Sequence, residues 1–199
     1  MMKRTAAFSL LALSLAGCVS VLPEPVVPDA LYRFSSTARP VEGAPVLLTA
    51  DVAVFEPEGS NLLLGRDIVF EGPGGELNVL ARSEWSEPAS RLLQAALLDR
   101  LSVLDPESTG VAVDERFSVT SAYELRWTIR DLVIGPESAV ITARVTLLEG
   151  SSGHVSGQTL IVMREPYTGR PDVEGTQALI SAARTAVDSI AVQLPDLMN

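Results

Sequence analysis

An alternation of apolar and polar residues is the strongest pattern in the chain, and it predicts strands. It is clearest over residues 117–130, where every second side chain is apolar except at Ser121, and polar groups fill the other positions except at Ala122. Turns rich in glycine connect this stretch to two further strand patterns, at 139–148 and 155–164, so the three predict a meander. An earlier apolar stretch, residues 46–55, predicts a mostly buried strand.

Helical spacing of apolar residues occurs twice. Leucine and alanine recur at steps of three and four from Leu92 to Leu104, residues 83–86 offer N-cap candidates, and Asp-Pro at 105–106 ends the pattern. A second seam predicts a closing helix over residues 176–194. The apolar positions of this seam are Ile180, Ala183, Val187, Ile190 and Leu194.

The order of these elements indicates the fold class. Two short strand patterns, 66–71 and 76–82, flank a Gly-Pro-Gly-Gly turn and predict a hairpin. The chain therefore reads as three strands, a helix, three strands and a helix. Its apolar faces are buried most simply in an α+β two-layer sandwich, with two helices on one face of a largely antiparallel sheet of about six strands.

The amino terminus has the features of an export signal. Lys3 and Arg4 precede an apolar segment at 5–15, and Leu-Ala-Gly-Cys occupies 15–18. This is the layout of a secretory signal, and its last four residues look like the bacterial lipobox. Cys18 is therefore the predicted lipidation site, with cleavage just before it, and several acyl chains would anchor the mature protein stably.

Three segments follow from this prediction. Residues 1–17 form the signal peptide, 18–30 a lipidated linker with three prolines, and 31–199 a single periplasmic domain. Val19 stands where an aspartate would retain a lipoprotein in the inner membrane of enterobacteria, which favours the outer membrane and leaves the inner membrane as the alternative. No other run of 18 or more apolar residues occurs, so we expect the remaining chain to lie outside the bilayer.

Composition excludes several classes of partner and site. The 15 Lys and Arg against 25 Asp and Glu give a net charge of -10, which becomes -12 once Lys3 and Arg4 leave with the signal peptide. Nucleic-acid binding needs clustered positive charge, so we expect no nucleic-acid partner. One cysteine and one histidine are too few for an intramolecular disulfide or a structural zinc site, and we expect no cofactor and no metal.

The sequence also offers no catalytic constellation. His154, the sole histidine, lies in a predicted loop, and the neighbouring Gly-Ser-Ser-Gly lacks the spacing of a nucleophile elbow. Glu84 and Glu87 could form an acid–base pair, yet their place at the predicted helix start favours a role in complementing the helix dipole. We therefore expect a protein that is not an enzyme.

Several short segments carry a family resemblance. After the lipobox come Tyr-Arg-Phe at 32–34, Arg-Asp-Ile-Val at 66–69, a segment at 77–88 that ends in Arg-Ser-Glu-Trp-Ser-Glu-Pro, and Tyr-Glu-Leu at 123–125. Together they resemble the ABC-type transport auxiliary lipoproteins, the paraquat-inducible protein C-like family. One departure is Leu-Leu-Gly-Arg-Asp at 63–67, where the family usually has a proline and an aromatic residue before Leu-Asp-Arg. The resemblance implies a non-enzymatic partner of an MCE-type lipid transporter, bound to an MCE-family protein and an ABC permease and ATPase.

Two aromatic residues are candidate anchors, either for packing or for a partner. Trp85 precedes the first predicted helix and would staple its first turn or present an indole to another protein, and Tyr32 opens the first resembling segment. Trp127 lies on the apolar side of its strand and is expected in the core.

These observations favour a membrane-anchored accessory subunit of a lipid transport system, in contact with partner proteins or with further copies of itself. The alternative is an envelope lipoprotein that captures a small apolar molecule, which predicts an apolar pocket of several hundred cubic ångströms. A third class, an anchored hydrolase, would need a constellation around His154.

Overall fold

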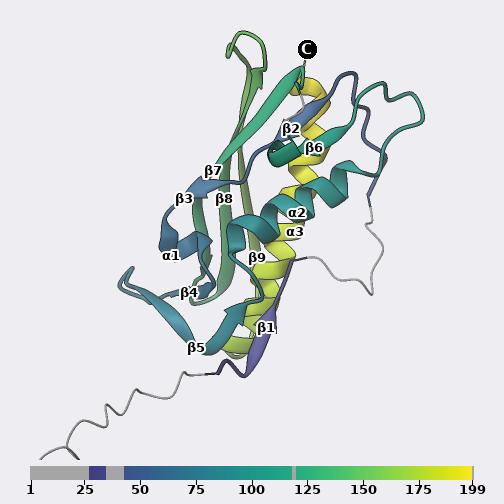
Figure 1. Cartoon of the computed structure of the whole chain (residues 1–199). Helices are drawn as coiled ribbons and strands as arrows, with labels where there is room; N and C mark the ends of the chain where they lie inside the picture. Colours follow the sequence, from purple (N-terminus) through teal and green to yellow (C-terminus); the bar gives the residue numbers. More distant parts are fainter. Residues whose placement is uncertain (1–26, 35–42, 118–119, 199) are drawn as a thin grey trace, which may run out of the picture.

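The computed structural model describes residues 27–34, 43–117 and 120–198 (Figure 1). The predicted signal peptide, Cys18 and most of the predicted linker lie outside these residues. Within the described ranges, no helix is long and apolar enough to cross a membrane.

Three long strands form one side of a mixed sheet and end at its edge. β7 (Tyr123–Ile134), β8 (Ser138–Glu149) and β9 (Val155–Pro166) follow one another in an antiparallel meander, as the sequence pattern predicts. The buried residues of β7 include Leu125 and Trp127, which lie on the predicted apolar face. This meander carries most of the sheet's antiparallel pairing.

Shorter strands extend the sheet beyond β7 and make it larger than predicted, with nine strands in the described chain. β4 (Asp67–Glu71) and β5 (Leu77–Trp85) form the predicted antiparallel hairpin. The remaining short strands pair in parallel: β1 (Ala30–Tyr32) with β5, β3 (Glu58–Gly59) with β7, and β2 (Val52–Val54) with both β7 and β6 (Ala112–Asp114). The α+β class is confirmed.

Helices cover one side of the meander. α3 (Thr176–Leu197) packs against β8 and β9, and α2 (Ala89–Leu101) crosses α3, as Figure 1 shows. A one-turn helix, α1 (Asn61–Leu64), and a π-helical turn (Pro171–Gly175) complete the described helices, apart from a short 3-10 helix before β7. The predicted seam of α3 faces the core, since Ala183, Val187, Ile190 and Leu194 are buried and Ile180 is partly buried against them.

The predicted start of the first long helix is wrong. Residues 83–86 are not an N-cap, because β5 continues through Trp85 and α2 begins only at Ala89, with Pro88 as its N-cap. Ser83 and Trp85 pair with Ala30 and Tyr32 of β1, and this distant partner holds the segment extended. The chain between residues 83 and 88 is therefore strand and turn, where local spacing indicated helix.

The predicted start of the strand at residue 117 is also wrong. Phe117 belongs to a 3-10 helix (Glu115–Phe117), is 73% exposed, and lies six residues before β7 begins. The carboxylate of Asp114 accepts a hydrogen bond from the Arg116 backbone N–H at 3.0 Å, which favours a turn at this point. The apparent alternation therefore extends across a turn into the true strand.

The two sides of the meander differ in character. Thr159 and Ile161 of β9 face α3, and the Thr159 hydroxyl donates to Gln193 of that helix at 3.0 Å. Leu160 and Val162 point the other way and are about half exposed. We call this second side of β7–β9 the outer face.

Candidate interaction surfaces

Trp85, one of the two candidate anchors, is the last residue of β5 and is only 1% exposed. Its ring packs on Phe34, with the centroids 4.5 Å apart and the planes tilted by 45°, a favourable aromatic arrangement. The Trp85 N–H donates to the Arg66 carbonyl at 2.7 Å, and Arg66 Nε donates to the Trp85 carbonyl at 3.3 Å. A side chain so fully covered can reach a partner only after local unfolding.

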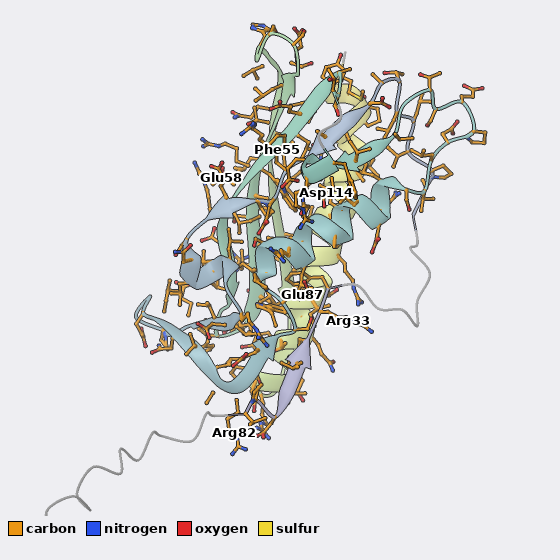
Figure 2. All side chains as sticks on the ribbon, in the orientation of Figure 1. Arg33, Phe55, Glu58, Arg82, Glu87 and Asp114 are labelled. Atoms are coloured by element: carbon orange, nitrogen blue, oxygen red, sulfur yellow. The ribbon has the colours of Figure 1, made fainter. Side chains whose placement is uncertain are left out.

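Tyr32, the other candidate anchor, lies opposite Trp85 at the end of β1 and is half-buried against the core. Its carbonyl accepts a hydrogen bond from the Ser86 N–H at 2.8 Å. Three residues earlier, the Asp29 N–H donates to the carbonyl of Arg82 at 2.7 Å and its carboxylate accepts from the Arg82 guanidinium at 2.7 Å. Arg82, labelled in Figure 2 where the chain enters the domain, has a left-handed backbone with φ 63°.

These bonds give the Arg-Ser-Glu-Trp-Ser-Glu-Pro segment at 82–88 a structural role. The segment bonds to β1 and to Arg66, the residue that precedes β4. Directly after it, the N–H of Ala89, the first residue of α2, donates to the Gly65 carbonyl at 2.8 Å. The segment thereby fixes Asp29, close to the start of the described chain, against the domain. Cys18 itself lies outside the described residues.

An open groove of about 640 Å³ lies between the β4–β5 turn, the β7–β8 turn and the outer face. Three valines contribute to its lining, and none of its four charged side chains forms an ion pair with another described residue. The Arg164 guanidinium donates to the Ser138 hydroxyl at 2.9 Å. The charged residues are Glu71, Asp131, Glu137 and Arg164, and the valines are Val133, Val140 and Val162.

A second open groove, of about 480 Å³, lies at the start of α2. Glu56 and Glu58 line it, and the Ser90 hydroxyl donates a hydrogen bond to the Glu56 carboxylate. Negative charge at this end of a helix complements the helix dipole, so the half-buried Glu56 carboxylate has a structural role.

The candidate chemical groups of the sequence lie apart from one another in the described chain. His154 is exposed in the β8–β9 turn, and no cluster of three or more His, Cys, Asp or Glu residues suited to a metal ion occurs in those ranges. Glu84 lies in β5 and pairs with Arg66 at 3.3 Å, so its predicted place at a helix start is wrong.

One strong electrostatic perturbation occurs near the N-terminal end of β7. Hydrogen bonds from the Arg116 guanidinium lower the pKa of Asp114 to about 2, although partial burial acts in the opposite direction. The same contact raises the pKa of Arg116 above its ordinary value. This pair closes the turn between β6 and the 3-10 helix and contributes to local structure.

Arg100 is a buried charge that the sequence analysis missed. Its side chain is 4% exposed, Nε donates to Asp188 of α3 at 2.6 Å, and Nη2 donates to the Ala44 carbonyl at 2.7 Å. The signal was present in the sequence, since Arg100 follows Leu93 and Leu97 on the apolar side of its helix. This residue connects α2, α3 and the loop before β2.

The fold and its surfaces define an α+β domain with a tightly fixed N-terminal entry and open, polar-rimmed grooves. The chain belongs to the family described as the ABC-type transport auxiliary lipoprotein component, whose model matches residues 32–194. No curated protein matches the chain. The match begins at the candidate anchor Tyr32 and ends near the carboxyl end of α3.

Solved structures support the same fold. Protein XCC0632 from Xanthomonas campestris is 15% identical, with a TM-score of 0.68 over 87% of this chain and 94% of that protein. An uncharacterized protein is 14% identical, with a TM-score of 0.66 over 84% of this chain and 99% of its own. At these identities the similarity concerns the fold alone.

Proposed function

We propose that this chain is a lipid-anchored accessory subunit of an MCE-type lipid transport system, held at the outer membrane and facing the periplasm. The observation that carries the proposal is the family match over residues 32–194, which makes the protein an auxiliary lipoprotein component of ABC-type transport. The finer assignment to lipid transport and to an MCE partner is supported by the sequence resemblance. The subunit would act by binding, without catalysis of its own.

The anchor in this proposal is Cys18. Eight residues lie between it and Val27, and a fully extended chain over these nine residue steps reaches about 30 Å. The hydrogen bonds between Asp29 and Arg82 fix the domain end of this tether. A short tether attached at a fixed point restricts which end of the domain faces the membrane.

The outer-face groove is our proposed contact surface for the partner. Three carboxylates and one guanidinium line it without an ion pair to a described residue, so a partner can supply the complementary charges. Rim charges of this kind mainly affect the rate and specificity of association. The buried aromatic residues Trp85 and Trp127 are already used in the core.

Affinity capture of the full chain from detergent-solubilised envelopes tests the proposal. We expect an MCE-family protein, an ABC permease and an ATPase to be recovered together. The variant Asp131→Asn/Glu137→Gln should weaken this recovery. The matched control Glu107→Gln/Asp196→Asn removes the same charge from exposed positions outside both grooves and should not. Capture without any MCE protein would refute the assignment.

The anchor is tested separately, because a lost anchor and a lost partner give different results. The Cys18→Ser variant should leave the outer-membrane fraction and lose the mass of the attached lipid in intact-protein mass spectrometry. The parent chain should be found in the outer-membrane fraction and should show the mass of the attached lipid. A parent chain found without lipid would contradict the anchoring step and leave the partner assignment to be judged by capture.

A further inference from the structure

β9 is an edge strand of the sheet. Along its 12 residues it pairs with β8, and no strand in the described chain pairs with its other side. The Tyr167 N–H donates to the Glu137 carbonyl at 3.2 Å, which shows that these two residues form a hydrogen-bonded pair of the antiparallel ladder. Such pairs alternate along the ladder, so the backbone groups of the even-numbered residues point to the open edge. These residues are Gln158, Leu160, Val162 and Arg164.

The β8–β9 register shifts once, between Leu147 and Leu148 near the start of β9, and beyond this point the edge lacks the features that usually prevent strand pairing. The strand has 12 residues, and its one proline, Pro166, is the last of them. The side chains of Leu160 and Val162 are 53% and 51% exposed. Natural edge strands are commonly short, bulged or rich in charge. An exposed, apolar edge of this length favours pairing with another strand.

The charge distribution favours a second copy of this chain as that strand. Residues 150–164 contain no Asp or Glu, and this is the longest acid-free run after residue 24 in a chain with a net charge of -10. Two copies repel each other over most of their surface, but two β9 strands bring no carboxylate opposite another along this run. Arg164 is the one formal charge there, with His154 neutral.

We infer that β9 pairs antiparallel with β9 of a second copy, in the register centred on Ile161. In that register Leu160 of each copy faces Val162 of the other, and Gln158 faces Arg164. All four residues on each strand have backbone groups that point to the open edge. Each opposed pair can therefore exchange two backbone hydrogen bonds, which gives roughly eight between the two strands. The pairing is isologous, because the same patch serves both copies, and it extends the sheet across the two-fold axis.

The pairing has a consequence for orientation. Figure 1 shows the chain entering the domain at the end opposite the β8–β9 turn, so antiparallel pairing sets the two entry points at opposite ends of the paired strands. Twelve residues of strand span about 40 Å. Both tethers therefore reach one membrane when β9 lies along its plane.

Charge-swap variants of the full chain in membranes test the register. Leu160→Glu/Val162→Glu puts carboxylates opposite each other in the pair and should weaken self-association by about ten-fold, as should Leu160→Lys/Val162→Lys. Co-expression of the Glu and Lys copies, with different tags, should restore co-purification of the two tags to the parental level. Both positions are half exposed, so each variant should keep its thermal unfolding midpoint.

Cysteine cross-linking supplies an independent readout with a matched control. One copy carries Leu160→Cys and a differently tagged copy carries Val162→Cys, and oxidation should join them, since opposed residues lie within disulfide range. Leu77→Cys with Val79→Cys, in the similarly exposed part of β5, should give no adduct, and neither should the parent. Absence of the β9 adduct, failure of the charge swap to restore association, or cross-linking of β9 to a different protein would overturn the inference.

Discussion

Replacement of Trp85 by alanine separates a packing role from a partner role at this position. The side chain is 1% exposed and stacks on Phe34, so its removal leaves a large cavity at the junction of β1, β5 and α2. Truncation of a buried tryptophan costs about 3–5 kcal/mol of unfolding free energy. That is a large part of the roughly 5–15 kcal/mol that stabilises an ordinary domain.

Urea unfolding measures this loss. With a slope near 2 kcal/mol per molar, the midpoint of the Trp85→Ala variant should fall by about 1.5–2.5 M. Trp127 remains as the fluorescence reporter, since it is buried and its indole N–H donates to the Phe55 carbonyl at 2.7 Å. Phe117→Ala, at a 73% exposed aromatic residue, is the control and should change the unfolding free energy by less than about 0.5 kcal/mol.

A double-mutant cycle with Phe34→Leu identifies the stacked pair itself. We expect a coupling free energy of about 0.5–1.5 kcal/mol between Trp85 and Phe34, beyond the area that each buries. A midpoint shift of less than about 0.5 M in Trp85→Ala, together with loss of partner capture, would refute the packing role and identify Trp85 as a contact residue.

Three further predictions concern other parts of the fold. Asp188→Ala should cost about 2–3 kcal/mol because it leaves buried Arg100 with the Ala44 carbonyl alone, whereas Arg100→Met should cost less than about 1.5 kcal/mol; the opposite order in thermal unfolding would contradict this account. Because the folded pKa of Asp114 is lowered to about 2, the stabilising effect of its carboxylate is present above about pH 4 and is lost as the pH falls toward 2. Solvent screening limits this effect to less than about 1 kcal/mol. Asp114→Asn should remove this contribution from the acid dependence of the unfolding free energy. Gly110→Ala should cost about 1–3 kcal/mol, since its Cβ would lie 2.1 Å from the Ala50 backbone, while Gly74→Ala, which meets only the flexible Glu76 side chain, should cost less in the same chemical denaturation assay.

The long elements of the fold could be predicted because their signals are local. Alternation identified the meander of β7, β8 and β9, and three–four spacing identified α3 nearly to its ends. A strand of 12 residues shows its period many times within its own sequence. The order of the long elements was sufficient to assign the α+β class.

The short strands could not be predicted in the same way. β1, β3 and β6 contain two or three residues each, too few to show a period, and each exists because a distant strand supplies its hydrogen bonds. The same reason explains the misplaced start of α2, since pairing with β1 keeps residues 83–85 extended. Non-local pairing outweighed local propensity in both cases.

The contact surfaces were the least predictable part. The groove residues Glu71, Asp131 and Arg164 come from three strands separated along the chain, and no spacing in the sequence indicates that they share one surface. Trp85 and Tyr32, by contrast, stand out in the sequence because of their residue type. The structure places these conspicuous aromatic residues at a structural junction.

Residues that stabilise the fold and residues that contact partners should respond differently to substitution. Changes at Trp85 or Arg100 should lower the unfolding free energy first, and lose partner binding only as the folded fraction falls. Changes at Asp131, Glu137, Leu160 or Val162 remove exposed or half-exposed groups, so they should alter association while the unfolding midpoint stays constant. Stability and association measured on the same set of variants therefore distinguish the scaffold of this lipoprotein from its contact surfaces, because scaffold changes move both quantities together and surface changes move only the second.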